Sequence, residues 1–375
     1  MKKKYLFLIM TISTIISVLE KTAPLQLQED YDNAGLITGA HHQECSGVLI
    51  CLDVTEEIID EAIEQNCNLI VAHHPIVFRG LKKFSGNSYV ERVLVKAIKN
   101  EVSIYSCHTN LDNVIDGVNG KIADKLGLIH RSILAPKKDF LEKLIVYAPE
   151  THADAIEKAL FNAGAGNIGN YSECSFVSEG IGSFKPGTDA NPYSGKKGLR
   201  SVEKEKKIEV TFPSWLRNQI LLAMKIAHPY EEVAYEISSI SNLYQEIGSG
   251  LTGELQVAMD EMEFLNKIKE IFNIKVIKHT VFLGKKIKKV AVCGGSGSFL
   301  TSKAISAGAD IYITSDIKYH EFFDAEGSLV LADIGHFESE QFTIDLIADV
   351  LRQNFPNFAI LKTKVNTNPV RYSVS

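Results

Sequence analysis

Short apolar runs alternate with helical patterns along most of this chain, and this alternation constrains the fold more than any other feature. Each apolar run in the first part is short and continuous, as expected of a strand that is buried on both faces of a sheet. The runs lie at 47–53, 68–72 and 102–107, and the helical patterns that follow them lie at 54–66, 88–101 and 117–128. Repeated strand–helix–strand order is typical of a parallel sheet covered by helices. We therefore predict an α/β fold, with Thr55 as an N-cap.

The C-terminal part repeats this order. Its predicted strands lie at 288–295, 310–314, 328–333 and 358–363, and its predicted helices at 299–308, 317–327 and 337–354. Segment 61–75 aligns by eye with 303–320, and segment 102–112 aligns with 328–340. An internal duplication of one α/β unit explains this likeness. We expect two similar α/β units with mostly parallel sheets that together form one domain.

A different pattern occupies the middle of the chain. Two strand–helix–strand units follow each other at about 138–246, which suggests a ferredoxin-like α+β module. The polar segment 185–207 between them is predicted to be a loop, and its Lys/Glu run a solvated surface. The predicted domains are therefore a first half of the main domain at 11–135, an insert at 136–246 and a second half at 247–375.

The N-terminus combines a basic start with an apolar run. A signal peptide begins in this way, but no small-residue cleavage site follows here. The run is too short for a membrane-spanning helix, which needs about 20 apolar residues. We prefer a first core helix at about 11–21, because its apolar residues recur at helical spacing. Residues 1–9 are then an extension, or Met10 is the true start.

The charge and the cysteines narrow the class of protein. The formal net charge is −6, so no basic excess is available to neutralise a phosphate backbone, and we expect no sequence-independent binding to nucleic acid. The six cysteines are scattered, and none forms a C-x-x-C pair. A chain of 375 residues with so few cysteines does not suggest a disulfide framework. A reducing, cytoplasmic setting without membrane attachment is the simplest interpretation.

Polar side chains that can bind metal follow four of the predicted strands. In open parallel sheets, ligands bind beyond the carboxyl ends of the strands. The residues at these ends are His73 with His74, His108 with Asp112, Asp316 with His320, and His336 with Glu340. Histidines scattered by chance would not favour strand ends, so this shared position indicates one functional site.

Each of these groups has a structural interpretation as well. A lone histidine is more often a hydrogen-bonded structural residue than a ligand. His336 and Glu340 share a helix face at i, i+4 spacing, yet an acidic residue near a helix start is also favoured by the helix dipole. A turn at Pro75 can bring His73 and His74 to one cleft. From spacing alone, the metal-binding and structural interpretations remain equally open.

Five motifs together resemble a known family. They are QEDYDNAGL (28–36), LIVAHHPIVF (69–78), YSCHTNLDN (105–113), ITSDIKYHEFFDA (313–325) and IGHFESE (334–340). They are similar to the motifs of the NIF-three-like family of dinuclear-metal proteins, also labelled GTP cyclohydrolase 1 type 2 homologues. The insert resembles the PII/CutA-like module of the longer bacterial members. The N-terminal extension and segment 248–255 depart from the family pattern, and neither includes a ligand position.

The resemblance implies a ligand set and an assembly. It assigns two divalent metal ions per chain to His73, His74, Asp112, His336 and Glu340. It places His108, Asp316, Tyr319 and His320 around these ligands or in a substrate cleft. It also implies self-association into a toroidal homohexamer.

Three imidazoles and two carboxylates without a thiolate suit Zn²⁺, Fe, Mn²⁺, Co²⁺ or Ni²⁺. Two such ions with two carboxylates and one hydroxide leave a net charge of about +1, so we expect a small anionic substrate such as a phosphoester or nucleotide. The first hypothesis is therefore a metal-dependent hydrolase, with His108 or His320 as the proton donor.

The alternative is a non-enzymatic metal-binding regulatory or scaffold protein whose insert senses a small ligand. The glycine-rich segment 162–170 of the insert could hold an anion, although a helix C-terminal stop explains its glycines more simply. Another glycine turn, CGGSGS (293–298), lacks the P-loop residues, and we predict tight strand-to-helix packing there.

Overall fold

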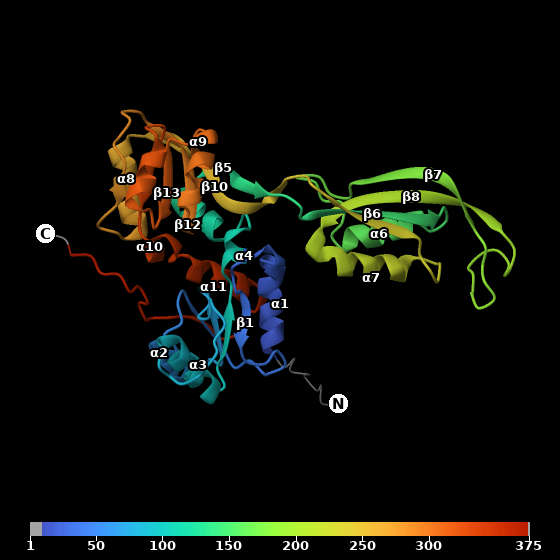
Figure 1. Ribbon diagram of the computed structural model, residues 1–375, viewed down its shortest axis with the longest axis horizontal. Coiled ribbons are helices and arrows are strands. Elements are labelled where there is room, and N and C mark those ends of the chain that lie inside the picture. Colours follow the sequence, from blue (N-terminus) through green and yellow to red (C-terminus); the bar gives the residue numbers. More distant parts are fainter. Residues whose placement is uncertain (1–9, 374–375) are drawn as a thin grey trace. The chain divides into compact units, whose positions relative to one another are not determined.

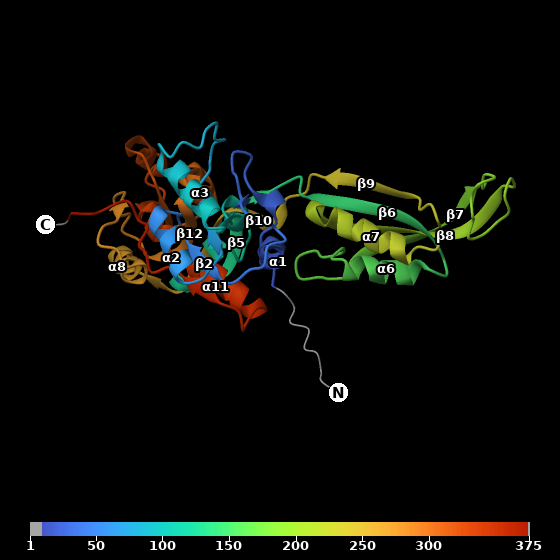
Figure 2. The same cartoon turned by 90° about the horizontal axis from the view of Figure 1, so that it is seen from below.

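The computed structural model describes residues 10–373, so the expectations for residues 1–9 lie outside the described residues. The chain divides into two compact units. One, the main unit, is formed by the chain up to Ala135 together with the chain from Ile247 onward, and the other, the insert, is Pro136–Glu246. Figure 1 and Figure 2 show the elements of both.

The main unit contains a five-stranded sheet built largely from the first half of the chain. Its strands are β1 (Gly35–Thr38), β2 (Val48–Cys51), β3 (Leu69–Ala72), β4 (Ser103–Ser106) and β15 (Ile360–Lys362), in the order β1-β4-β3-β2-β15. All neighbours are parallel except the antiparallel pair β1 and β4. The middle strands are buried throughout, which confirms the interpretation of their continuous apolar runs.

Helices cover both faces of this sheet. They are α1 (Ile12–Thr22), α2 (Glu56–Glu64), α3 (Tyr89–Lys99) and α11 (Thr343–Asn354). Alternate residues of β2 point to opposite sides, so that Leu49 packs with the apolar residues of α2 and α3, and Ile50 packs with those of α1 and α11. The predicted first core helix is therefore confirmed.

A six-stranded sheet completes the main unit. Its strands are β5 (Ile129–Lys137), β10 (Tyr244–Met259), β11 (Lys278–His279), β12 (Ile287–Ser296), β13 (Ile311–Ser315) and β14 (Val330–Asp333), in the order β11-β14-β13-β12-β10-β5. Strands β12, β13 and β14 are parallel, while β10 pairs antiparallel with β12 and β11 with β14. Further helical elements of the main unit are α4 (Thr109–Asp112), α5 (Val118–Leu126), α8 (Glu261–Phe272), η3 (Ser298–Leu300), α9 (Thr301–Ser306), η4 (Tyr319–Ala325) and α10 (His336–Glu340).

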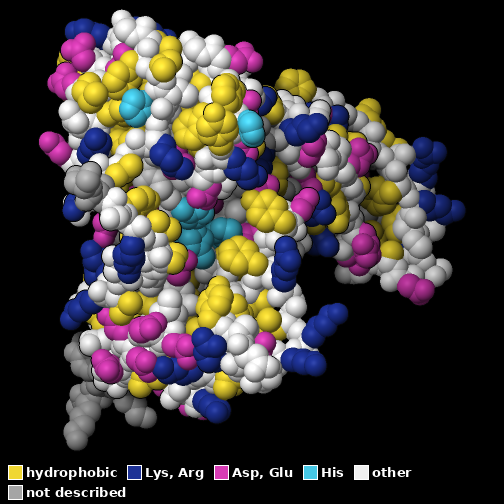
Figure 3. All heavy atoms as spheres, turned by 60° about the vertical axis from the view of Figure 1, so that its left-hand side comes forward, with side chains coloured by type: hydrophobic (Ala, Val, Ile, Leu, Met, Phe, Trp, Pro, Cys, Tyr) yellow, Lys and Arg dark blue, Asp and Glu magenta, His cyan; other side chains and the backbone are white. Residues whose placement is uncertain are grey.

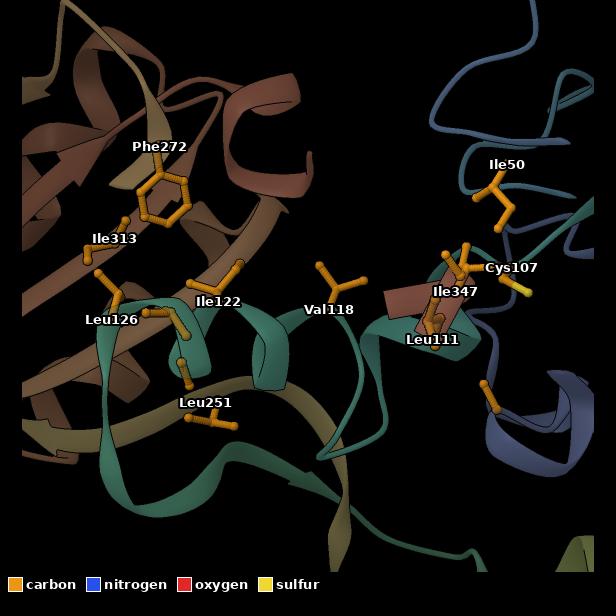
Figure 4. Packing of buried hydrophobic residues seen from close by; sticks show 14 of the residues in the cluster. Ile50, Cys107, Leu111, Val118, Ile122, Leu126, Leu251, Phe272, Ile313 and Ile347 are labelled. Atoms are coloured by element: carbon orange, nitrogen blue, oxygen red, sulfur yellow. The ribbon is translucent and has the colours of Figure 1, made fainter. Parts of the chain in front are cut away.

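One hydrophobic core joins the two sheets. Helix α5 contributes Ile122 and Leu126, which lie with Phe272 and Ile313 in Figure 4. The same cluster continues to residues of the five-stranded sheet and its helices, including Ile50, Cys107, Leu111 and Ile347. The two halves of the main unit therefore form one packed body, which can hold a site between them.

The insert has the predicted ferredoxin-like order. Its elements are β6 (Leu141–Pro149), α6 (Ala153–Asn162), β7 (Ser175–Phe184), β8 (Ser201–Pro213), η2 (Ser214–Leu216), α7 (Arg217–Ala227) and β9 (Tyr235–Ile240). The antiparallel sheet has the order β7-β8-β6-β9, and the apolar residues of α6 and α7 pack in one cluster with those of the strands. Gly164 follows α6 with a φ of +98°, so the first glycine of segment 162–170 serves as the helix stop.

Three sequence-based predictions need correction. The loop predicted at 185–207 is wrong for residues 201–207, which belong to β8, because backbone pairing with β7 and β6 holds this polar run in a strand. The helix predicted at 337–354 is divided into α10 and α11, because α10 packs on β12 and β13 whereas α11 packs on α1 and β15. The helix predicted at 317–327 is the 3₁₀ helix η4.

Within residues 10–373, we find no helix with the length and apolar content needed to cross a membrane.

The N-cap of α2 gives a first testable prediction. Thr55 Oγ1 accepts a hydrogen bond from the Ile58 N–H at 3.4 Å, as its position before the helix predicted. We expect Thr55→Ala to lower the free energy of unfolding by about 1 kcal/mol, because the N–H loses its acceptor. Urea unfolding of metal-free protein measures this loss. Thr55→Ser keeps the hydroxyl, so an equal loss in that variant would contradict the capping explanation.

Candidate metal centre

His73 is positioned by the end of β3 and by its neighbour β4. Its side chain is completely buried, and its Nδ1 donates to the backbone oxygen of Cys107 at 2.7 Å. This leaves Nε2 as the atom that faces the centre. That nitrogen lies 3.7 Å from Asp112 Oδ1 and 3.7 Å from Glu340 Oε1. His73 therefore faces two carboxylates without a hydrogen bond to either.

His74 has the same arrangement with a different anchor. Its Nδ1 lies 2.8 Å from Oδ1 of Asp53, the second residue after β2. Its Nε2 lies 3.0 Å from Glu340 Oε2. Pro75 follows directly, so the strand ends here, and both histidines direct Nε2 at the Glu340 carboxylate.

The second half of the chain supplies His336, the first residue of α10. Gly335 precedes it with a φ of +92°. The Nδ1 of His336 lies 2.5 Å from Asp316 Oδ2, and its Nε2 lies 3.2 Å from Glu340 Oε2 and 3.3 Å from His74 Nε2. Each of the three imidazoles thus has Nδ1 held by an oxygen and Nε2 directed at the centre. This is the usual arrangement of histidines that bind metal.

Three buried atoms of the centre have no hydrogen-bond partner. They are His73 Nε2, Asp112 Oδ1 and Glu340 Oε2. A buried polar group left unpaired costs about 1–3 kcal/mol, and more when it is charged. A cation among these atoms would satisfy the nitrogen and both carboxylates at once. The donor set therefore fits divalent metal ions, and these His and Glu groups could hold them.

The electrostatics of the ion-free centre show strong mutual attraction. Burial would raise the pKa of Glu340, but the charge of His73 and the nearby nitrogens of His336 and His74 outweigh it and hold that pKa well below its usual range. Burial would lower the pKa of His74, but the hydrogen bond to Asp53 and the nearby Glu340 carboxylate raise it to about 10. Asp316 and Glu340 likewise raise the pKa of His336 to about 11, against the effect of burial. These pairs keep Glu340 ionised.

His108 joins this group from the end of β4. Its Nδ1 lies 2.6 Å from Asp32 Oδ1, and Asp32 also accepts from the Thr109 N–H at 3.0 Å. Burial would raise the pKa of Asp32, but these bonds lower it to about 2. The His108 ring centroid lies 5.4 Å from that of His73 and 5.5 Å from that of His74.

Two sets of three residues each have ligand atoms within 4.8 Å of one another, and they share His74. One set is His73, His74 and His108, and the other is His74, His336 and Glu340. The predicted ligand Asp112 completes the centre beside His73. The structure therefore brings all five predicted ligands together, with His108 next to them.

The centre opens into a cavity of about 730 Å³ in the main unit. Figure 3 shows the histidine side chains at the bottom of a hollow on one face, with apolar side chains beside it. Asp316 lines this cavity, as expected. The structure does not bring Tyr319 or His320 to it: both lie exposed on η4, where the His320 ring stacks on Phe323. A helical turn after β13 carries them away from the strand end.

Sequence reasoning missed three contributors to the centre. Asp53 is the last residue of the predicted strand 47–53. The expectation that ligands bind beyond the carboxyl ends of parallel strands could therefore have identified it. Asp32 lies within a recognised motif, but only the fold shows that it holds His108. Gly295, in the CGGSGS turn, gives room to the centre: a Cβ built there would lie 2.2 Å from Glu340 Oε1. The predicted tight packing is present, and the Glu340 carboxylate occupies the space.

The anchors of the histidines give a second prediction. Asp53→Asn removes the negative charge that orients His74, so we expect metal affinity to fall by about 10–100-fold. Competition with a chromogenic chelator measures this change. Asp60→Asn on α2, where Asp60 pairs only with Lys96 at the surface, is the control and should keep the wild-type affinity. Equal affinities in both variants would contradict the role of Asp53.

Comparisons with known proteins agree with this architecture. A model of the Duf34/NIF3 (NGG1p interacting factor 3) family matches residues 10–369. A Halalkalibacterium halodurans protein named GTP cyclohydrolase 1 type 2 homolog is 38% identical over 364 residues, which cover 96% of this chain and 98% of that protein. A Bacillus subtilis protein of the same name is 39% identical over 325 residues, which cover 86% and 87%.

Solved structures are similar over the same length. A Bacillus cereus protein related to NIF3 matches with a TM-score of 0.86 and 36% identity, covering 97% of this chain and 100% of that one. A Staphylococcus aureus protein matches with a TM-score of 0.76 and 29% identity, covering 97% and 99%.

Proposed function

The chain belongs to the Duf34/NIF3 family, and from that premise we propose that it binds two divalent metal ions and hydrolyses a small anionic substrate, a phosphoester or nucleotide. The observation that carries the proposal is the set of buried, unpaired atoms on His73, Asp112 and Glu340, surrounded by anchored imidazoles. The name GTP cyclohydrolase 1 type 2 homolog, which belongs to the relatives, also points to a nucleotide.

The grouping of the predicted ligands around Glu340 suggests two ion positions. His74, His336 and Glu340 would hold one ion, and His73 and Asp112 the other, with Glu340 within reach of both groups. Nitrogen and oxygen donors without thiolate suit Zn²⁺, Fe, Mn²⁺, Co²⁺ or Ni²⁺. When bound, such a pair supplies an activated water and polarises a substrate oxygen.

The residues around the ions have their own roles. Asp32 holds the Nδ1 of His108, so Nε2 of that ring is free to give a proton to a leaving group in the cavity. Seven carboxylates and one lysine line the cavity: Glu29, Asp53, Asp112, Asp316, Asp333, Glu338 and Glu340, with Lys278. Lys278 is itself paired with Asp333 at 2.6 Å. An anionic substrate therefore needs the positive charge of the ions in order to bind here.

Elemental analysis and a substrate panel test the proposal. We expect about two metal ions per chain after reloading. We also expect turnover of phosphoesters or GTP that depends on the ions. His74→Ala should lose both properties. Fewer than about one ion per chain in the reloaded wild type would refute the dinuclear centre.

The alternative function is a metal-binding regulatory or scaffold protein whose insert senses a small ligand. The insert supports it as a separate compact unit with its own core. Full metal loading without turnover of any panel member would favour this alternative.

We also propose a homohexamer in the cytoplasm. A mass of six chains by light scattering would support the hexamer, and a monomer would refute it. The free state of all six cysteines fits a reducing compartment.

A further inference from the structure

Aromatic residues make up most of the apolar part of the cavity wall, which also includes Cys293. Its aromatic residues are Tyr31, Phe78, Phe299, Phe337 and Tyr372. Leucine, isoleucine and methionine do not line the described cavity, and Val370 is its one aliphatic side chain besides Pro369. A pocket for an alkyl chain would be lined by such aliphatic residues. Flat, rigid aromatic faces instead suit a flat ligand.

Four of these aromatic side chains are largely exposed. The exposed fractions are 73% for Tyr31, 53% for Phe78, 67% for Phe299 and 52% for Tyr372. Large aromatic side chains left open around a polar centre mark a binding surface rather than a core. They come from both halves of the main unit, so the cavity is bordered by aromatic side chains from more than one segment of the chain.

Phe78 lies beside the candidate proton donor, and Tyr31 is the sequence neighbour of the residue that holds it. The ring centroid of Phe78 is 5.7 Å from that of His108, in an edge-to-face arrangement. Tyr31 directly precedes Asp32, whose carboxylate holds His108. A ring placed on Phe78 and Tyr31 would therefore lie next to the proton donor, with its attached anion directed to the ions.

From this we propose that the substrate carries a planar heteroaromatic ring as well as its anionic group, as a nucleotide does and a sugar phosphate does not. The inference rests on the proposed function, because the anionic group is held by the metal ions. Tyr31 and Phe78 hold the ring, and they distinguish nucleotides from other phosphoesters. Stacking of one base on an aromatic side chain typically contributes about ten-fold or more in affinity.

Calorimetric titration of metal-loaded protein tests the inference. The ligands are the four ribonucleoside 5′-monophosphates and ribose 5-phosphate. We expect at least one nucleotide to bind about ten-fold more tightly than ribose 5-phosphate, and Tyr31→Ala or Phe78→Ala to remove that preference. Phe323→Ala is the matched control, because this side chain is 67% exposed but lies outside the cavity.

The possible outcomes separate the two proposals. If the loaded protein binds neither class of ligand, the anionic-substrate function fails. If all five ligands bind with equal affinity, and Tyr31→Ala and Phe78→Ala leave these affinities unchanged, the proposed anion site is supported and the ring site is refuted. A change of oligomeric mass in the cavity variants with unchanged nucleotide affinity would also refute it, because a second chain would then cover these rings.

A separate observation concerns the C-terminal segment 363–372. Thr367 Oγ1 donates to Asp53 Oδ2 at 3.0 Å, while Asp53 Oδ1 holds His74. The buried Asn368 donates from Nδ2 to Glu338 Oε1 at 2.9 Å, two residues before Glu340. We infer that Thr367 is a positioning residue that fixes Asp53, and through it the His74 ring. This inference also rests on the proposed metal binding.

The same segment offers a matched control. Thr363 Oγ1 donates to Glu61, so Thr363→Val also removes a threonine–carboxylate bond, but one away from the cavity. We expect Thr367→Val to weaken metal binding by about ten-fold in chelator competition, and Thr367→Ser to restore it. Thr363→Val should keep the wild-type affinity. Failure of the wild-type protein to bind metal would refute the proposed function. Equal metal affinities for wild type and Thr367→Val would refute only the positioning role of Thr367.

Discussion

Glu340→Gln protein is expected to fold normally and to lose its metal ions. The carboxylate of Glu340 lies 3.0 Å from the nearest nitrogen of His74, 3.2 Å from that of His336 and 3.7 Å from that of His73. No other side chain approaches all three rings in the described chain with such distances. An amide keeps the size of the group but removes its charge. We expect metal affinity to fall by more than about 100-fold, beyond the loss caused by a partner that only orients a ligand.

Metal content after reloading and dialysis measures this loss. Glu261→Gln is the control, because Glu261 is also buried and accepts from the backbone N–H groups of Leu283 and Gly284 at 2.7 and 3.0 Å. That variant should lose stability and keep its ions. A Glu340→Gln protein that retains two ions per chain would show that Glu340 is not a ligand.

Gly295→Ala is expected to have a comparable effect through space alone. The added Cβ would lie 2.2 Å from Glu340 Oε1 and 3.4 Å from His336 Cε1, so the carboxylate must leave its position. The obstructing atoms belong to side chains, which lets the protein fold around the change. We expect most of the metal affinity to be lost, as in Glu340→Gln.

Gly308→Ala provides the matched comparison for this prediction. Gly295 has a φ of +64° and Gly308 a φ of +71°, so alanine at either position is strained by about 1–2 kcal/mol. A Cβ at Gly308 meets nothing within 4 Å. The midpoint temperature of thermal unfolding should therefore fall by a similar amount in both variants, while only Gly295→Ala should lose metal. Equal metal content in the two proteins would contradict the steric explanation.

The part of the site that could be predicted consists of residues that directly follow buried parallel strands, where ligands usually bind. His73, His74 and His336 follow buried strands whose continuous apolar runs are visible in the sequence, so their convergence could be inferred. His320 follows a strand as well, yet η4 carries it away, because the path of a short turn is not encoded in hydrophobic periodicity. That the five residues bind metal stays a proposal.

Strands with an unusual composition were harder to predict. Gly248, Gly250 and Gly253 interrupt the pattern of β10, although Gly253 allows Leu128 to approach closely. The Lys/Glu residues at 201–207 hide the start of β8, because its stability there comes from pairing with β7 rather than from apolar side chains. Such strands are defined by their neighbours, and a single sequence does not show which segments become neighbours.

The centre draws its residues from two stretches of chain that are separated by the insert. During synthesis, His73, His74 and Asp112 leave the ribosome first, and His336 and Glu340 follow after a delay of about 10–45 s at 5–20 residues per second. A nascent chain at that stage therefore carries only three of the five predicted ligands. On the proposed metal binding, full affinity would develop only when the C-terminal half has folded onto α5. Metal uptake would then distinguish complete chains from truncated ones.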